Sequence, residues 1–504
     1  MTPAGGKGLT RRRFVALGCA AVAGMLTGRA SARVASRLST AVGVAAAGGR
    51  FATHPTWNPP PVVVDTPAAG TAAGLIFVAP ISFTSTEIPP GRYGPLIVDD
   101  EGEPVWFLPL ATVLAQNLRV QKYRGSDVLT WYEGTAGPTT YGGSCVIYDS
   151  AYRELHRVHA GNGFDCDLHE FLITARDTAL LSVSNEVTAD LSSIGGATDG
   201  RLVEGIVQEI DPASKRVLFE WHSLDHVGID ESFRTDVTAG GNVDYFHINS
   251  IAVDSDGDLL VSARHTSTVY KLDRKTGAVK WRLGGKKNDF QLGPGAGFNF
   301  QHDARAHPDG TLTLFDNGAT SVGAQDVEPA SRPLRLRLDE EAMTAELVQV
   351  YQASQPRLAI ALGDVQQLPD GGVFVGWGSA GPFSEFTPDG SVRFDATFGD
   401  GSVSYRALRF PWAGHPASSP AVAATSNSDG TMNVYASWNG ATDVARWQVR
   451  TGPARTRLRA VHTAKRTGFE TAITVPAARY VSIVALNRAG KDIGASPPAA
   501  TRSL

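Results

Sequence analysis

The chain has 504 residues, a formal net charge of −4 at pH 7 and 19% charged residues. Because no long basic run follows residue 13, this charge pattern argues against a nucleic-acid partner. The length allows a large buried core, and the 54 glycines and 29 prolines are typical of a turn-rich, all-β protein.

The first 32 residues resemble a twin-arginine export signal. Arginines at 11–13 precede a moderately apolar stretch that ends in the small residues Ala30-Ser31-Ala32. From Phe14 to Gly28 this stretch is shorter than the roughly 20 apolar residues that cross a membrane. We therefore expect export through the twin-arginine pathway to the cell envelope or the extracellular space, without stable membrane insertion after cleavage.

Removal of that segment would leave two cysteines, Cys145 and Cys166. An even pair in an oxidising compartment predicts a single disulfide, whose loop would support the approach to His169. The alternative is two separate buried thiols.

A recurring pattern of short apolar runs fills the middle of the chain. Residues 33–73 are rich in Ala, Gly and Pro and predict an extended lead-in, with order beginning near Gly74. From there six similar outer hairpins alternate with five inner ones, which predicts a six-bladed β-propeller over residues 74–412. The N-terminal strands and a strand near 405–412 would close the last blade. Five or seven blades are the alternatives.

Residues 413–504 begin with a linker-like segment and continue as short alternating strands. Trp438, Trp447 and the segment YVSIVALNRAGK resemble a fibronectin type III module, which implies a small C-terminal β-sandwich. Because we find no clustered ionisable residues in it, we expect a role in attachment or packing.

Three histidines occupy equivalent positions. His169, His247 and His302 each open an apolar-alternating run that leads into a hairpin turn. A single histidine is usually a buried residue satisfied by one hydrogen bond. Repetition at three blade entrances instead predicts that the imidazoles converge at one mouth of the central channel.

Polar residues accompany these histidines. Strand alternation places Asn249 on the face of His247, and Arg264 one hairpin further along. Asn317 and Trp377 lie at the exits of second strands and are candidate substrate-binding residues. Several imidazoles with one guanidinium suit an anionic tetrahedral group, because Arg binds its oxygens in pairs. A neutral imidazole is a competent nucleophile near pH 7, and a second one can carry a proton.

Three phrases carry a family resemblance: DYFHINSIAVDSDGDLLVSARHTS, WRLGG and FQHDARAHPDGTLTLFDNG. They are similar to the arylsulfotransferase family of exported six-bladed propellers, and the likeness runs from Gly74 to Trp412. This resemblance implies sulfuryl transfer from a phenolic sulfate ester to a phenol, through a sulfohistidine and without a nucleotide donor or other cofactor. It implies His302 as the nucleophile. The residues implied to bind the sulfate oxygens and handle the phenolic proton are His247, Asn249, His169 and Arg264.

Two other functions stay open at this point. Three imidazoles could ligate Zn or Cu, although a cationic Arg264 beside a dication is unfavourable and no HxH or CxxC pair is present. A non-catalytic propeller that binds an envelope glycan or protein is the other alternative.

Overall fold

The computed structural model describes residues 50–82, 88–136, 141–234, 237, 242–318 and 329–502. The predicted export signal, residues 1–32, lies outside this part of the chain. The described residues form an all-β protein, which confirms the predicted fold class. They also contain four short 3₁₀ helices: η3 (Ser192–Ile194), η4 (Ser223–Asp225), η5 (Ile229–Glu231) and η6 (Gly378–Ala380). None of the helices in the described ranges is long and apolar enough to span a membrane.

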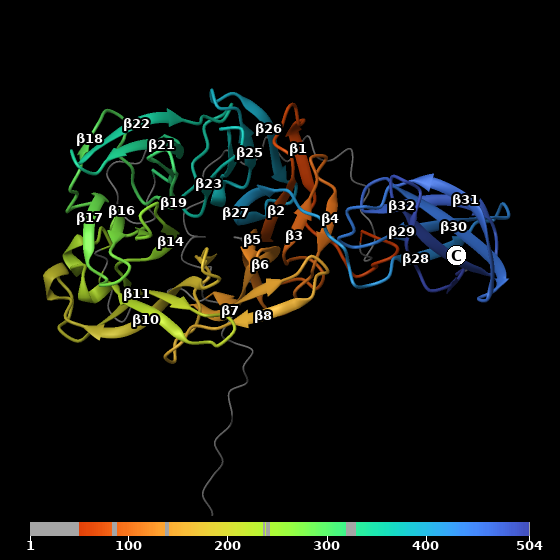
Figure 1. The fold of residues 1–504 in the computed structure, drawn as a ribbon, viewed down its shortest axis with the longest axis horizontal. Coiled ribbons are helices and arrows are strands. Elements are labelled where there is room, and N and C mark those ends of the chain that lie inside the picture. The colour runs from red at the N-terminus through yellow and green to blue at the C-terminus, as the bar shows by residue number, and fades with distance from the viewer. Residues whose placement is uncertain are drawn as a thin grey trace, which may run out of the picture.

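Six sheets follow one another around a ring in the described chain (Figure 1). From the innermost strand outward, the first three are β27 (Val403–Phe410), β2 (Leu75–Ile81), β3 (Leu96–Val98), β4 (Pro104–Phe107); β5 (Leu114–Tyr123), β6 (Ser126–Ala136), β7 (Tyr141–Tyr148), β8 (Glu154–Val158); and β9 (Phe171–Ile173), β10 (Ala179–Ala189), β11 (Gly200–Ile210), β12 (Val217–His222), with β13 (Val243–Asp244) beside β11. The other three are β14 (Ile248–Val253), β15 (Leu259–Ala263), β16 (Thr268–Leu272), β17 (Val279–Gly284); β19 (His302–Ala306), β20 (Thr311–Asp316), β21 (Arg332–Asp339), β22 (Thr344–Val350), β18 (Gln291–Leu292); and β23 (Asp364–Gln367), β24 (Val373–Gly376), β25 (Phe383–Phe386), β26 (Val392–Phe398), β1 (Val62–Thr66). The strands of these sheets pair antiparallel except for the short strands β13 and β18, which pair parallel.

The inner hairpins form because tight turns bring alternating apolar runs together. In the β14–β15 hairpin the N–H of Gly257 donates to the carbonyl of Asp254 at 2.9 Å. Gly257 has φ +90°, a backbone conformation that glycine adopts without steric cost. Each inner strand therefore runs from one mouth of the ring to the other, and its partner returns.

The ring closes by pairing its two ends. Strand β27 pairs with β2 from Leu75 opposite Phe410 to Ile81 opposite Val403, as the sequence predicted for the strand near residues 405–412. The lead-in prediction is wrong in one respect. Strand β1, at Val62–Thr66, pairs with β26 and adds a fifth strand to the neighbouring sheet, so sheet structure begins before Gly74.

Apolar side chains fill the space between neighbouring sheets. Between the sheets of β2 and β6, for example, Phe77, Trp106 and Trp131 are almost fully buried. Burying a side chain of this size contributes on the order of 2–3 kcal/mol. This packing makes the ring rigid, and the inner strands hold their side chains at fixed positions around the axis.

Cys145 and Cys166 are free, buried thiols, so the predicted disulfide is absent from the structure. The Cys166 thiol donates to the carbonyl of Val158 at a sulfur–oxygen distance of 3.6 Å. Burial and the neighbouring Cys166 raise the pKa of the Cys145 thiol well above its usual value. Because the thiolate is the reactive form, this environment keeps Cys145 as an unreactive thiol.

The C-terminal module is a sandwich of two sheets around one core. The first sheet is β28 (Ala421–Ser426), β29 (Thr431–Ser437), β32 (Glu470–Pro476), and the second is β31 (Arg457–Lys465), β30 (Arg446–Ala454), β33 (Tyr480–Leu486), β34 (Asp492–Ala495), with β35 (Ala499–Ala500) beside β33. Trp447, Val449 and Ile483 lie buried between the sheets. The resemblance to a fibronectin type III module stays a prediction.

The module is fixed to the side of the ring (Figure 1). The side chain of Asn439 accepts a hydrogen bond from the Phe107 N–H and donates one to its carbonyl, both at 2.9 Å. The predicted linker is also bound, because the N–H of His415 donates to the carbonyl of Ser150 at 2.7 Å. Residues of the lead-in complete the junction, where Thr53 donates to Glu470.

Candidate active site

The predicted histidines open the inner strands of three consecutive sheets. His169 lies two residues before β9, His247 lies directly before β14, and His302 is the first residue of β19. The ring centroids of His169 and His247 are 4.6 Å apart, in an edge-to-face arrangement. Burial is nearly complete for His169 and His302, with 4% and 1% exposure.

Tyr405 on β27 lies near His302 as well as near the pair formed by His169 and His247. Its ring centroid is 5.5 Å from that of His169 and 6.3 Å from that of His302. The hydroxyl donates to the carbonyl of Asn249 at 2.6 Å, and burial raises the pKa of Tyr405, so the phenol stays protonated. The closing strand carries no repeated hairpin, so the sequence pattern did not identify this residue.

The hydrogen bonds around His302 define its protonation state. The Asn317 amide nitrogen donates to the carbonyls of Ala359 and Leu362, at 2.8 and 3.0 Å, so its oxygen faces His302. His302 Nδ1 lies 2.7 Å from that oxygen and must donate to it. Nε2 then carries the lone pair, and it accepts a hydrogen bond from the Leu362 N–H at 3.3 Å. Asn317 thus positions His302, whereas the sequence predicted a substrate-binding role.

Electrostatics keep His302 neutral. Burial and the nearby Arg264 guanidinium together lower the pKa of His302 well below its usual value. A neutral ring with its proton on Nδ1 presents Nε2 as a nucleophile at neutral pH.

Carboxylates orient the other two histidines. His169 Nδ1 donates to Asp167, and His247 Nδ1 lies 2.5 Å from Asp244. Although burial opposes ionisation, the adjacent imidazole lowers the pKa of Asp167, and His247 and His265 lower that of Asp244 well below its usual value. Ionised carboxylates can only accept, so both rings donate from Nδ1 and leave Nε2 as the nitrogen that exchanges protons.

Arg264 follows β15 and lies beside His247, as predicted. Its backbone N–H donates to the His247 carbonyl at 2.9 Å. Nη1 lies 2.7 Å from Nε2 of His265, Nη2 donates to the carbonyl of Ile360 at 2.9 Å, and the guanidinium covers the ring of Phe300. His265 donates from Nδ1 to the Asp244 carbonyl at 2.6 Å, so its Nε2 accepts from Arg264. Burial lowers the pKa of His265 to about 3.

Asp244, His247 and His265 are also the described residues that could hold a metal ion. Their ligand atoms all lie within 4.8 Å of one another. The same atoms already take part in the hydrogen bonds above, and Arg264 Nη1 is directed at His265. A dication here would face a guanidinium, which is unfavourable unless an anion lies between them.

Two predicted substrate-binding residues lie elsewhere. Asn249 is fully buried and its amide donates to the carbonyl of Gln301 at 2.5 Å. The predicted alternation fails because the β14–β15 ladder has a bulge between Ile248 and Ser250, and His247 has φ +61°. Trp377 is 1% exposed, and its indole nitrogen donates to Ser384 at 2.8 Å. The tryptophan therefore belongs to the core between sheets.

A buried charge network lies behind the rings along the axis. Each of three ring-bearing residues is followed by a charged residue of this network: His169 by Glu170, His302 by Asp303, and Tyr405 by Arg406. Arg406 contacts Glu170 and Asp303, both at 3.1 Å, and Glu170 also pairs with Arg119 and Arg305. Although burial opposes both charges, the three guanidiniums lower the pKa of Glu170 and the two carboxylates raise that of Arg406. The network fixes the backbone on which the rings are mounted.

The fold and the site together define a β-propeller protein with one neutral imidazole bound to an amide, two carboxylate-bound imidazoles and a guanidinium at one end of its axis. A family model described as Arylsulfotransferase (ASST) matches residues 119–399, more than half of the chain, and the chain belongs to this family. No curated protein matches the chain.

Solved structures give weaker similarities. A protein of unknown function from Bacteroides caccae is 14% identical, with a TM-score of 0.41, covering 67% of this chain and 99% of that one. Virginiamycin B lyase from Staphylococcus aureus, an inactive variant with quinupristin, is 8% identical, with a TM-score of 0.35, covering 74% of this chain and 96% of that one. Similarities of this size have no weight for function.

Proposed function

We propose that the protein is an exported arylsulfate sulfotransferase in which His302 carries the sulfuryl group between a phenolic sulfate ester and a phenol, without a nucleotide donor. The observation that carries the proposal is the state of His302, a buried neutral imidazole whose Nδ1 proton is held by Asn317. Membership of the arylsulfotransferase family supports the same reaction class.

In the first step Nε2 of His302 attacks sulfur. A nitrogen–sulfur bond forms, the bond from sulfur to the aryl oxygen breaks, and its electron pair leaves with the phenolate. Asn317 keeps the Nδ1 proton in place, so the sulfohistidine has a protonated ring, which makes the imidazole a good leaving group for the second step. Arg264 lies where it can offset the negative charge of the sulfuryl oxygens.

The phenolate takes its proton from His247 or His169. Both rings are fixed by carboxylates through Nδ1, which leaves Nε2 for the substrate. Burial lowers the pKa of His247 in the free protein, but a bound anionic ester favours the protonated ring. In the second step the same ring removes the proton of the acceptor phenol, which attacks sulfur and releases His302.

Intact-mass measurement after mixing with 4-nitrophenyl sulfate tests this proposal. Wild type should gain one sulfuryl group and release nitrophenolate in a burst, and phenol should remove the adduct. A folded protein that shows neither adduct nor turnover over a wide panel of aryl sulfates would contradict the proposal and favour a non-catalytic binding propeller. Activity that is lost with a chelator and restored by a metal would favour a metal site at Asp244, His247 and His265 instead.

A further inference from the structure

A basin opens at the end of the channel opposite the histidines. A cavity of about 1310 Å³ lies among the turns that end the inner strands, and a smaller one of about 440 Å³ adjoins it. Arg119 and Arg305 line both cavities. Since His302 lies opposite Phe315 and Arg305 opposite Thr313, with a bulge between them, Arg305 lies roughly 7 Å further along the strand than His302.

The floor of this basin has an excess of positive charge. Arg119, Arg305 and Arg406 face the ionised Glu170 and Asp303. The nearby acid Asp364 does not offset this positive charge, because burial and the adjacent Asp303 raise its pKa well above the usual value. Three guanidiniums therefore share two carboxylates, and a net charge at the floor of a concave site concentrates the field there.

Arg119 is the guanidinium best placed to use this charge. Within the described residues its one ion pair runs from Nη1 to Glu170 at 2.9 Å, and 13% of its side chain is exposed. Burial, with Arg305 and Arg406 close by, lowers the pKa of Arg119 to about 10, so it stays charged at neutral pH.

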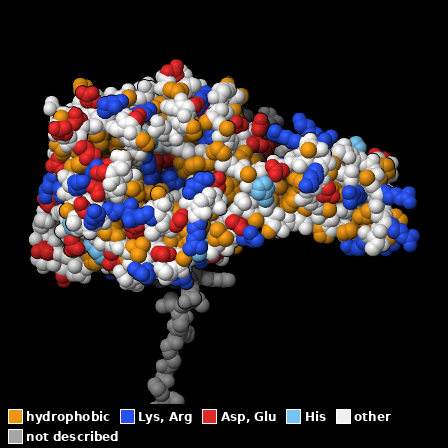
Figure 2. All heavy atoms as spheres, in the orientation of Figure 1, with side chains coloured by type: hydrophobic (Ala, Val, Ile, Leu, Met, Phe, Trp, Pro, Cys, Tyr) orange, Lys and Arg blue, Asp and Glu red, His pale blue; other side chains and the backbone are white. Residues whose placement is uncertain are grey.

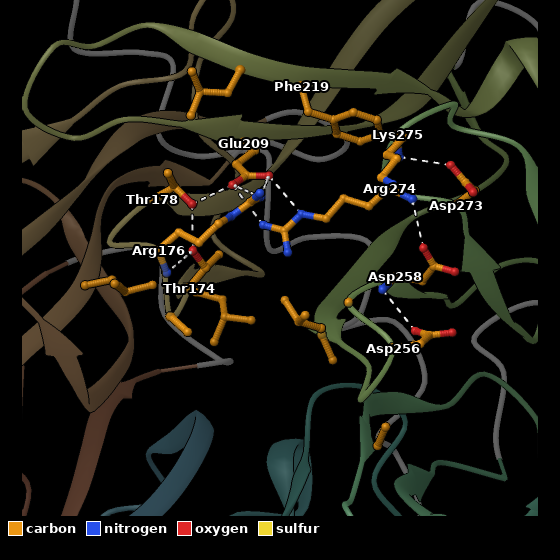
Figure 3. A pocket seen from close by; sticks show the side chains of 18 of the residues that line it. Thr174, Arg176, Thr178, Glu209, Phe219, Asp256, Asp258, Asp273, Arg274 and Lys275 are labelled. Carbon is orange, nitrogen blue, oxygen red and sulfur yellow. Dashed lines mark hydrogen bonds and ion pairs between the residues drawn. The ribbon is translucent and has the colours of Figure 1, made fainter.

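The walls add apolar surface, and most of their carboxylates are paired with cations. Glu209 accepts from both Arg176 and Arg274 (Figure 3). Asp258 pairs with Lys280 and Asp256 with Lys271, whereas Asp273 accepts from the N–H groups of Lys275 and Thr276. Leu218 on the same wall is 45% exposed, and Phe219 lies beside it.

We propose that this basin binds a small organic anion, with a sulfate, sulfonate, phosphate or carboxylate group against Arg119 and Arg305 and an apolar body along Leu218 and Phe219. The cavity exceeds the roughly 300–1,000 Å³ of common small-molecule sites, so the ligand can be larger than one aromatic ring. The site is separate from the imidazoles and does not depend on sulfuryl transfer.

Equilibrium dialysis of the full chain with naphthalene-2-sulfonate tests the site, because its carbon–sulfur bond offers no transferable sulfuryl group. Arg119→Gln should weaken binding in the basin about tenfold or more, since a charge-assisted contact is lost. Should that variant fail to fold, the exposed Lys275→Glu should weaken it instead, with Lys491→Glu on the C-terminal module as the matched control. Arg264→Gln, at the opposite mouth, should leave binding in the basin intact.

Two results would overturn the proposal. One is wild-type affinity in both Arg119→Gln and Lys275→Glu. The other is equal binding of uncharged 2-naphthol, which would make the basin an apolar surface only.

The C-terminal module carries a net charge opposite in sign to that of the ring. Residues 413–504 contain eleven Lys and Arg against four Asp and Glu, a net +7, whereas residues 50–412 contain 28 against 46, a net −18. No Lys or Arg of described residues 413–502 makes an ion pair; the pair found there joins His415 to Asp443. The other part of the described chain pairs its charges extensively.

Basic side chains gather on two neighbouring strands, contrary to the expectation from sequence. Strand β31 is the edge of its sheet, pairs with β30 and is exposed along almost its whole length. The two strands carry a basic edge, which we define as Arg446, Arg450, Arg457, Arg459 and Lys465. In Figure 2 blue side chains mark the end of the module far from the ring.

We propose that the basic edge binds a linear anionic polysaccharide. The charges are spread along strands and not around a pocket, which suits an extended polyanion. Of the large apolar side chains in described residues 413–502, Val461 is the exposed one, which disfavours a membrane surface. Tyr480 lies beneath Arg455 and Arg479, so it is not available for stacking against bases.

Retention of the full chain on dextran sulfate, eluted with a sodium chloride gradient, tests this surface. Arg457→Glu with Arg459→Glu should elute at clearly lower salt, because each phosphate- or sulfate-like contact contributes to the salt dependence. Arg216→Glu with Arg337→Glu makes the same charge change on exposed hairpins of the ring and should elute like wild type. Equal elution of the two double variants, or equal retention on double-stranded DNA or on anionic vesicles, would overturn the proposal.

Discussion

The two ends of the channel are built by the same inner strands and differ in how they treat charge. At the histidine end the rings are held neutral, since burial lowers the pKa of His302, His247 and His265. Toward the other end the groups are permanently charged, with Arg119 and Arg305 exposed to the basin. A neutral imidazole, His302, and a fixed cation, Arg305, thus lie three residues apart on one strand.

Neighbouring residues in the sequence serve both ends. In β27 successive side chains point to opposite sides, so Tyr405 and Arg406 point in different directions. The other two pairs depart from a regular strand, because Glu170 precedes β9 and β19 has a bulge after His302. Arg406 binds both Glu170 and Asp303, which come from two other sheets, and the neighbours of all three in sequence are the rings of the site. The buried charge network therefore positions the neutral rings of the site.

Removing His302, the proposed nucleophile, should have the largest effect. We expect His302→Asn to abolish the sulfuryl adduct and to lower turnover roughly 10³-fold or more, because both displacements need Nε2. Mass spectrometry and nitrophenolate release measure this, and thermal unfolding should match wild type within a few degrees. An adduct that still forms in His302→Asn would move the nucleophile to another residue, with His247 tested next.

Disrupting the buried charge network should chiefly reduce the stability of the fold. Glu170→Gln leaves three guanidiniums with Asp303 alone, and an uncompensated buried charge costs about 3–5 kcal/mol. Urea unfolding of this variant is compared with that of Glu154→Gln, which removes an exposed partner of Arg157. Equal losses in the two variants would mean that the axial network does not hold the ring centre.

Asn317→Ala separates positioning from binding. Without the amide oxygen His302 loses the acceptor that fixes its proton on Nδ1, so we expect the rate of adduct formation to fall roughly 10- to 100-fold. KM for the donor should change little, because Asn317 does not face the substrate in this arrangement. A large rise in KM with an unchanged adduct rate would return Asn317 to the substrate-binding role that the sequence suggested.

Much of this comparison could be predicted from the sequence, because it rests on repetition. The turn signals and alternating runs predicted the succession of sheets, and three histidines at equivalent positions predicted a shared mouth. Tyr405 could not be found in this way, since the closing strand has no hairpin of the repeated kind, although Tyr405-Arg406 mirrors His302-Asp303. Its pairing with the distant β2 is what brings it to the axis.

The errors have local physical causes. A bulge in the strand and the left-handed backbone of His247 turn the Asn249 side chain away from the predicted face. Neither feature can be read from the periodicity of the sequence. Trp377 ends its strand like the polar residues of other sheets, but its ring packs edge-to-face against Phe315. The buried charges pair across the axis only because the ring closes. The sequence alone therefore did not predict the buried charge network.

His247→Asn should have an effect that depends on the donor. If this ring protonates the departing phenolate, transfer from phenyl sulfate should slow about 10²-fold or more, while 4-nitrophenyl sulfate should be affected much less. A series of donors with rising phenol pKa measures the dependence. Equal slowing for every donor would assign the proton to His169, for which the same series should then give the steeper response.

The smallest effect expected is on stability in mild acid, and it comes from the neutral rings. The folded pKa of His265 is lowered to about 3 from an ordinary value of 6.5, so below pH 6.5 the unfolded chain binds a proton that the folded chain does not. The free energy of unfolding therefore falls as pH falls from 6.5 toward 4, by at most about 1.4 kcal/mol per pH unit for this ring. His265→Gln should remove that share, so urea unfolding at several pH values should give a shallower slope of unfolding free energy against pH for the variant than for wild type.

The exposed His462→Gln supplies the matched control substitution. If wild type and His265→Gln keep the same slope, the ring is not held neutral against Arg264, and the contrast between the two ends of the channel would lose its main support.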